Sequence, residues 1–198
     1  PWLEGDVMRL GAEDWGSNLS ADQIHEFGRQ AMSSLAAVHK VDISKVPYLG
    51  DPVPFADDVT RWDRFYAKAA EPERLKDVPA VRQRLLDTVP QNAPVGIFHG
   101  DFQTANLFAS KDAQLLALID WELTGVGATL NDVGWICTFS DGQAWVENTD
   151  RTMFLTPDTL IDLYQNAYGQ EVQNINWYRA LAAYKFAIIS GLNLSLHR

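Results

Sequence analysis

The 198-residue sequence lacks several features that define special classes of protein. Its single cysteine, Cys137, excludes a disulfide framework and fits a reducing, cytoplasmic setting. No run of 18 apolar residues occurs. The most apolar stretch, residues 180–196, is interrupted by Lys185 and three uncharged polar residues, so it predicts a buried helix and no membrane span. No signal peptide is visible, which agrees with a cytoplasmic location.

Positive charge is also scarce, with 16 Lys and Arg against 26 Asp and Glu and a net charge of −10. Such a surface repels phosphate backbones, which argues against a nucleic-acid partner. The same charge is compatible with a cationic small-molecule partner, although simple solubility also explains it. Hydrophobic residues make up 46% of the chain, a globular composition.

Helical patterns cover most of what remains. Ser20 and Gln23 form a capping-box pattern ahead of a helix over residues 21–40. Thr156 and Pro157 start another, which Gly169 is placed to end. Further helices are expected at residues 59–69, 73–88, 129–139 and 175–196.

A small β element interrupts the helices near the middle of the chain. Residues 95–98 form a short apolar run, and residues 107–109 and 115–119 predict a hairpin with a five-residue loop. The first 19 residues show little periodicity and read as a loop or linker. The predicted fold class is therefore mainly α with a small β-hairpin (α+β).

A cluster of polar residues, HGDFQTAN at 99–106, lies between the first strand and the hairpin. Because a hairpin brings its ends together, Asp120 is expected near Asn106. A carboxylate and an amide oxygen suit Mg²⁺. Asp101 is then free to orient a hydroxyl group and accept its proton. These are the parts that phosphoryl transfer needs.

The cluster also resembles a known family. Its spacing, His-x-Asp-x-x-x-x-Asn, is that of the protein-kinase catalytic loop, with Gly100 in place of Arg. The stretches HGDFQTANLF, IDWELTGVG and NDVGW, within residues 97–135, resemble the aminoglycoside phosphotransferase and choline kinase superfamily. They are most similar to the branch that includes kinase-like domains fused to some acyl-CoA dehydrogenases. The expected fold is the large (C-terminal) lobe of a protein kinase.

The resemblance implies a small-molecule kinase that moves the γ-phosphoryl group of ATP to a hydroxyl group with the help of Mg²⁺. Asp101 would be the catalytic base, and Asn106 and Asp120 would bind the metal ion. His99 would be structural, and Asp132 would brace the catalytic loop through backbone N–H groups.

Two further implications concern the edges of the site. Glu122 follows the metal-binding position closely enough to act beside it. Trp2 and Leu3 belong to a stretch, PWLEG, that resembles the hinge lining the adenine pocket.

The resemblance also suggests how the chain is divided. Residues 1–19 would be hinge and linker from a missing small lobe. Residues 20–198 would form the helical lobe, with catalytic loop 99–106 and metal-binding segment 119–122. No Gly-rich phosphate loop and no strand-borne Lys precede the catalytic segment. The fragment is therefore expected to be inactive alone.

Other interpretations stay open. A non-catalytic kinase-like binding module fits the same residues, whereas a metal hydrolase using His99 and Asp101 would need more clustered ligands. Asp132 could instead be an acid favoured by a helix dipole, and Trp135 a plain core aromatic. The acceptor is undefined, and the departures from the family at Gln103 and Ala105 leave its class open.

Overall fold

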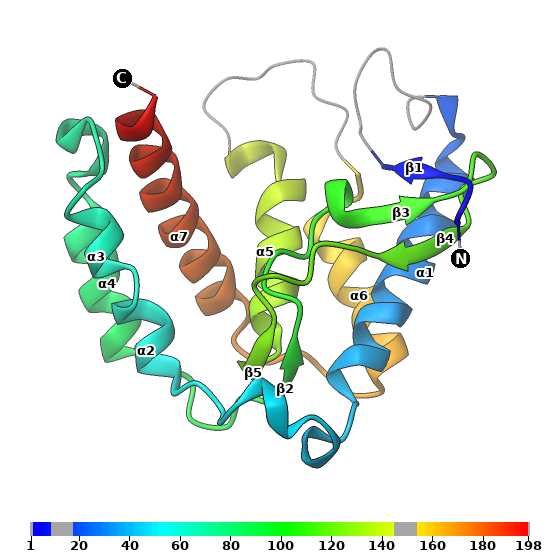
Figure 1. Ribbon diagram of the computed structural model, residues 1–198, viewed down its shortest axis with the longest axis horizontal. Helices are drawn as coiled ribbons and strands as arrows, with labels where there is room; N and C mark the ends of the chain where they lie inside the picture. Colours follow the sequence, from blue (N-terminus) through cyan, green and yellow to red (C-terminus); the bar gives the residue numbers. More distant parts are fainter. Residues whose placement is uncertain (1, 9–17, 145–153, 198) are drawn as a thin grey trace.

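The computed structural model describes residues 2–8, 18–144 and 154–197. Helices surround two small patches of β-structure (Figure 1). The α-helices are α1 (Ala21–His39), α2 (Phe55–Thr60), α3 (Asp63–Tyr66), α4 (Val78–Asp87), α5 (Leu130–Ser140), α6 (Pro157–Tyr168) and α7 (Ile175–Leu196). The strands are β1 (Asp6–Val7), β2 (Val95–Phe98), β3 (Leu107–Ala109), β4 (Leu115–Leu118) and β5 (Gly125–Ala128). Short 3₁₀ turns occur at Ile43–Lys45, Pro47–Leu49, Pro72–Leu75, Thr104–Asn106 and Gly142–Ala144. The expected mainly helical fold with a small β element is confirmed.

The helix ends follow the local chemistry of the sequence. The Gln23 backbone N–H donates to Ser20 Oγ at 3.2 Å, and the Ser20 N–H donates to Gln23 Oε1 at 3.0 Å, so the predicted capping box is formed. At α6 the Thr159 N–H donates to Thr156 Oγ1, and Gly169 ends the helix with φ +82°. Both boundaries of α6 are as predicted.

Two predicted helices are wrong in their extent. The helix expected at 59–69 is replaced by two short helices, α2 and α3, and beside the break the Tyr184 hydroxyl of α7 donates to the Val59 carbonyl (3.4 Å). The helix expected at 73–88 begins only at Val78. Its second residue is Pro79, which has no N–H and fits only the first turn of a helix.

The strands form two antiparallel sheets, β1–β3–β4 and β2–β5. The predicted hairpin is present, with Leu107 opposite Leu118. Strand β1, in a segment expected to be loop, pairs with β3, and β5 was not predicted because its sequence, GVGA, has low strand propensity. A Cβ at Gly125 would lie 2.9 Å from the Phe98 ring, so packing against β2 selects glycine there.

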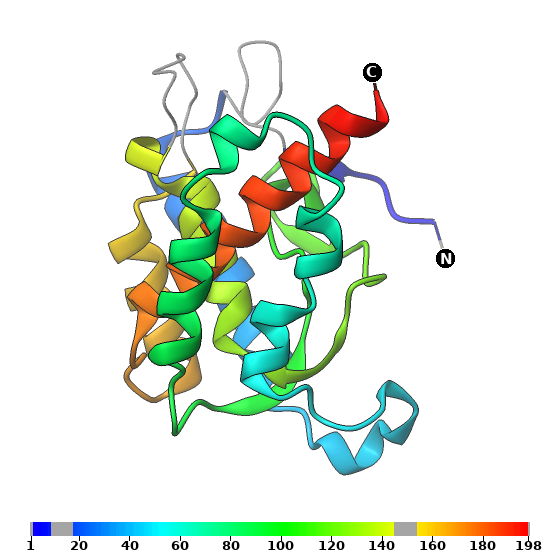
Figure 2. The same cartoon turned by 90° about the vertical axis from the view of Figure 1, so that its left-hand side faces the viewer.

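The helices pack in two groups around α5. Helix α7 lies between α5 on one side and α2, α3 and α4 on the other (Figures 1 and 2), while α1 packs against α6. Helices α5 and α7 approach closely, since a Cβ at Gly134 would lie 2.6 Å from the Tyr178 backbone. The first turn of α5 also lies beside the end of β2, because Asp132 accepts from the backbone N–H of His99, where the polar cluster begins. Within the described ranges, no helix has the length and apolar character needed to cross a bilayer.

Candidate active site

The polar loop 99–106 leaves the end of β2 through a sharp turn at Gly100. Its φ is +92°, and a Cβ at this position would collide with the Leu123 carbonyl. Glycine adopts positive φ without the steric cost that other residues incur. The glycine that replaces the kinase Arg therefore lets the loop pass close to the segment that precedes β5.

Asp132, in the first turn of α5, holds the start of this loop. Its Oδ2 accepts from the His99 backbone N–H at 2.6 Å, and its Oδ1 accepts from the Gly100 N–H at 2.8 Å. His39, the last residue of α1, lies 3.1 Å from Oδ2 through its Nε2. Asp132 is 1% exposed, so the loop is fixed by a buried carboxylate with partners from two segments, the loop itself and α1.

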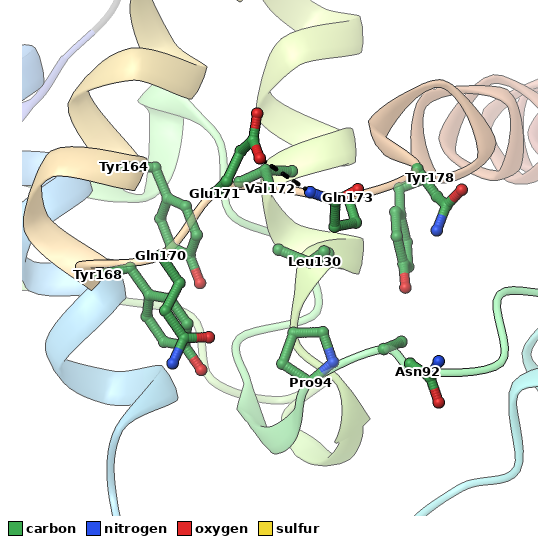
Figure 3. A pocket seen from close by; sticks show the side chains of 12 residues that line it. Asn92, Pro94, Leu130, Tyr164, Tyr168, Gln170, Glu171, Val172, Gln173 and Tyr178 are labelled. Atoms are coloured by element: carbon green, nitrogen blue, oxygen red, sulfur yellow. Dashed lines mark hydrogen bonds between the residues drawn. The ribbon is translucent and has the colours of Figure 1, made fainter.

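The bracing continues to α6 through Tyr164, whose hydroxyl lies 2.8 Å from His39 Nδ1. Burial raises the pKa of the Tyr164 phenol, which keeps it a hydrogen-bond donor. An arrangement in which Tyr164 donates to His39 Nδ1 and His39 Nε2 donates to Asp132 gives each group a partner. Tyr164 also lines a cavity of about 210 Å³ (Figure 3).

His99 is fully buried and links the two functional segments. Its Nε2 lies 2.9 Å from the Ile119 carbonyl, and its Nδ1 accepts from the Asp101 backbone N–H at 3.3 Å. A carbonyl can only accept, so the proton sits on Nε2. The ring of Trp121 lies over it, with centroids 4.6 Å apart. His99 thus ties loop 99–106 to segment 119–122.

The Asp101 carboxylate is held by three donors. Gln103 Nε2 reaches both oxygens at 2.8 and 3.0 Å, and Asn106 Nδ2 reaches Oδ2 at 3.0 Å. The Trp135 indole N–H donates to Oδ1 at 2.7 Å. Charge-assisted bonds of this kind are stronger than neutral ones. They fix the carboxylate in one orientation.

Sequence reasoning missed the contacts of Gln103 and Trp135. In the sequence Gln103 is only a departure from the family pattern, and Trp135 resembles a core aromatic residue. Trp135 is indeed 6% exposed, but its polar edge serves Asp101. The signal available in the sequence was the need of a buried indole N–H for an acceptor.

A backbone contact joins the segment of the buried Asn106 to that of the exposed Asp120. The Ile119 N–H donates to the Asn106 carbonyl at 3.1 Å, which places Asp120 beside Asn106. Asp120 is exposed and has φ +64°, a left-handed conformation that Asp tolerates. The Asn106 amide nitrogen is used by Asp101, which leaves its oxygen for another partner.

These two residues fit Mg²⁺ better than a metal that is held by protein alone. No group of three or more His, Cys, Asp or Glu that could hold a metal occurs within residues 2–8, 18–144 and 154–197. Mg²⁺ needs only one or two carboxylates because it keeps waters and shares phosphate oxygens. One carboxylate and one amide oxygen meet that requirement.

The remaining predicted residues lie at the periphery. Glu122 is exposed. Trp2 and Leu3 are 94% and 46% exposed and precede β1, and part of the expected linker, residues 9–17, lies outside the described residues. Hydrogen bonds link His99, Asp101, Asn106 and Asp132, and Asp120 follows Ile119, whose N–H donates to the Asn106 carbonyl. Glu122 lies two residues further along the same segment.

The fold and this arrangement of loop, hairpin and buried Asp define a kinase-like phosphotransferase lobe. A model of the phosphotransferase enzyme family matches residues 1–182. The chain belongs to this family, and the resemblance found in the sequence is confirmed.

Relatives in other organisms support the same branch of the family. Acyl-CoA dehydrogenase family member 11 of Gallus gallus is 29% identical over 180 residues, covering 81% of this chain and 22% of that protein. The human protein of the same name is 26% identical over 175 residues, covering 80% of this chain and 22% of its own length. The chain therefore spans less than a quarter of these relatives.

Solved structures share the fold. A protein of Ralstonia eutropha described as an aminoglycoside phosphotransferase superposes with a TM-score of 0.79 at 22% identity, covering 96% of this chain and 61% of that one. A choline/ethanolamine kinase family protein of Mesorhizobium loti gives 0.55 at 13% identity, covering 98% and 67%. The identities are low, so these likenesses establish the fold alone.

Proposed function

We propose that the chain is the catalytic lobe of an ATP-dependent kinase that phosphorylates a hydroxyl group of a small molecule. The observation that carries the proposal is the Asp101 carboxylate, held by three donors in a loop that also contains Asn106 and that bonds to the segment carrying Asp120. Such a carboxylate is placed to orient a hydroxyl and accept its proton.

In the proposed reaction the acceptor oxygen forms a bond to the γ-phosphorus while the bond from that phosphorus to the ADP oxygen breaks. The hydroxyl proton passes to Asp101. Asn106 and Asp120 would hold Mg²⁺, which supplies neutralisation of the phosphate charge when it is bound with ATP. Trp135, Gln103 and Asn106 keep Asp101 aimed at the acceptor, so little reorganisation is needed during transfer.

The proposal places the phosphate clamp outside this chain. The sequence before residue 99 has no Gly-rich phosphate loop and no Lys in an apolar strand, which kinases use to hold the nucleotide. Trp2 and Leu3 would then be hinge residues beside the adenine. Activity is therefore to be tested in the natural protein that contains this chain, and residues 1–198 alone are expected to turn over slowly or not at all.

The test compares Asp101→Ala and Asp120→Ala with Asp112→Ala, an exposed aspartate in the hairpin loop that serves as the matched control. Turnover is followed as ADP release over a panel of hydroxyl acceptors, and binding as a thermal shift with Mg-ATP. Asp101→Ala is expected to abolish turnover and keep nucleotide binding. Asp120→Ala is expected to abolish the Mg²⁺-dependent part of nucleotide binding.

Two outcomes oppose the proposal in different ways. Normal turnover of Asp101→Ala would show that this carboxylate is not the base. Mg-ATP binding by the wild-type protein with no turnover on any acceptor would favour the non-catalytic binding module instead.

A further inference from the structure

A small pocket lies beside the catalytic loop, between α2, α5 and α7. Gly100 forms part of its wall, with Asn131 and Trp135 from α5 and Lys185 from α7. Its volume of about 50 Å³ has room for one small polar group and not for a whole sugar or nucleotide. It therefore has the size of a subsite for one functional group of a larger ligand.

Two buried polar atoms of this pocket have no hydrogen-bond partner. The Trp62 indole N–H is one, and Asn131 Oδ1 is the other. The orientation of the Asn131 amide is fixed, because its Nδ2 donates to Asp58 Oδ2 at 2.8 Å. Buried polar groups in native proteins are nearly always paired. A donor and an acceptor left open in one small pocket point to a ligand that supplies the missing partners.

The pocket also contains an ammonium group without an ion-pair partner. Lys185 Nζ lies 5.0 Å from the centroid of Trp135 and 5.6 Å from that of Trp62. In the part of the chain that the structure describes, Nζ makes no hydrogen bond or salt bridge. Burial lowers the pKa of Lys185, while the Asp58 carboxylate acts to raise it. Cation–π contacts hold the amine in place and leave its N–H donors unused.

The way in which the nearby charges are already paired favours an anion. Arg61 lies 3.5 Å from Asp58, so that carboxylate already has a cation beside it. Arg61 and Lys185 are the two basic side chains of the pocket wall, against one carboxylate. Asp101 and Asp132 also act on Lys185, but their oxygens already accept from other donors. The whole-chain charge of −10 is compatible with a cationic acceptor, but the pocket wall itself has more basic than acidic side chains.

We propose that this pocket binds an oxyanion of the acceptor molecule, a carboxylate or a phosphate ester, through Lys185, Arg61 and the Trp62 indole N–H. The inference rests on the proposed function, because it assigns the class of acceptor for the same site. Trp135 connects the pocket to the catalytic loop, because its ring lies under Lys185 and its N–H donates to Asp101. An oxyanion seated on Lys185 would bring a hydroxyl of the same molecule toward Asp101, while Asn131 Oδ1 accepts from a further O–H.

The test measures binding without requiring catalysis. The natural protein is labelled with ¹⁵N in its tryptophan indoles, and the Trp62 signal is assigned with Trp62→Phe. The probes are glycerate, glycerol 3-phosphate, glycerol and choline, which carry a carboxylate, a phosphate, no charge and a positive charge. The first two arms separate the two sources of oxyanion.

At least one of the two anions is expected to shift the Trp62 indole signal saturably, with no shift from glycerol or choline. Lys185→Met is expected to weaken that binding by about tenfold or more, because a charge-assisted bond is lost. Lys68→Met, an exposed lysine after α3, is expected to leave binding unchanged. Arg61→Gln, with its side chain 44% exposed, keeps the test usable if Lys185→Met does not fold, and it should weaken binding severalfold.

A shift produced by choline or glycerol and by neither anion would overturn the proposal. So would anion binding that survives unchanged in both Lys185→Met and Arg61→Gln. Failure of the proposed function looks different: the anions would still bind at Trp62, but Asp101→Ala would leave turnover unaffected.

Discussion

Replacing Asp132 by Asn tests whether this residue braces the catalytic loop or only interacts favourably with the dipole of α5. The carboxylate is buried and serves the backbone N–H groups of His99 and Gly100 together with the His39 ring. Asn keeps the shape but offers only one acceptor oxygen. Whichever way the amide turns, at least one buried N–H faces an NH₂ group and loses its acceptor.

The expected loss of stability follows from the number of buried N–H groups that lose their acceptor. Leaving a buried donor unpaired costs about 1–3 kcal/mol, so Asp132→Asn should lower the free energy of unfolding by about 2 kcal/mol. For a chain of this size that corresponds to a fall in Tm of about 4–8 °C. A charge acting on the helix dipole alone would contribute about 0.3–1 kcal/mol.

Urea unfolding followed by circular dichroism and by tryptophan fluorescence measures the difference. Asp158→Asn is the matched control, since Asp158 is also an acid in the first helical turn, of α6, but is exposed. If Asp132→Asn costs no more than Asp158→Asn, the bracing argument is refuted and the dipole explanation stands.

The remaining predictions concern the loop, its carboxylate and the core. Gly100→Ala should destabilise the protein more than Gly169→Ala, because both positions have positive φ but only at Gly100 would a Cβ collide with backbone. The urea midpoints of the two variants measure this difference, and equal losses of stability would contradict the predicted clash. Trp135→Phe removes the N–H that donates to Asp101 and should lower turnover about tenfold with little change in acceptor KM. Trp177→Phe, which removes the N–H that donates to the Leu85 carbonyl, should lower only stability. Equal turnover in both variants would show that Trp135 does not position Asp101. Burial raises the pKa of the Cys137 thiol to about 12, so at pH 8 it stays protonated and should resist a thiol reagent until urea unfolds the chain; rapid labelling of the native protein would contradict this.

The sequence predicted the parts of the site that depend on short-range order. His99, Asp101 and Asn106 lie within one loop, and a hairpin of known loop length returns the chain to Asp120. Turn chemistry and strand alternation are local, so their outcome is readable from neighbouring residues. The same holds for the ends of α6, where a capping Thr and a terminal Gly set the boundaries.

What could not be predicted depends on contacts between distant segments. The division between α2 and α3 lies beside a contact with a hydroxyl on α7, more than 100 residues later in the sequence. Strand β5 exists because its glycines fit under Phe98. Trp135 is an aromatic residue in an apolar stretch, which predicts a core position, and only the folded chain shows that its N–H donates to Asp101.

Helix α5 explains why these distant contacts concentrate at one place. All of its residues except Phe139 are buried, yet it carries Asn131 and Asp132 in its first turn. A helix that is buried on all sides accommodates polar groups only when they are satisfied by partners. Asp132 is satisfied by the catalytic loop, and Asn131 is half satisfied by Asp58. Because Gly134 lets α7 approach closely, Lys185 lies against Trp135, and the open half of Asn131 faces the same pocket. Asp132 and Asn131 thus face, respectively, the loop that would carry the chemistry and the pocket that would select the acceptor.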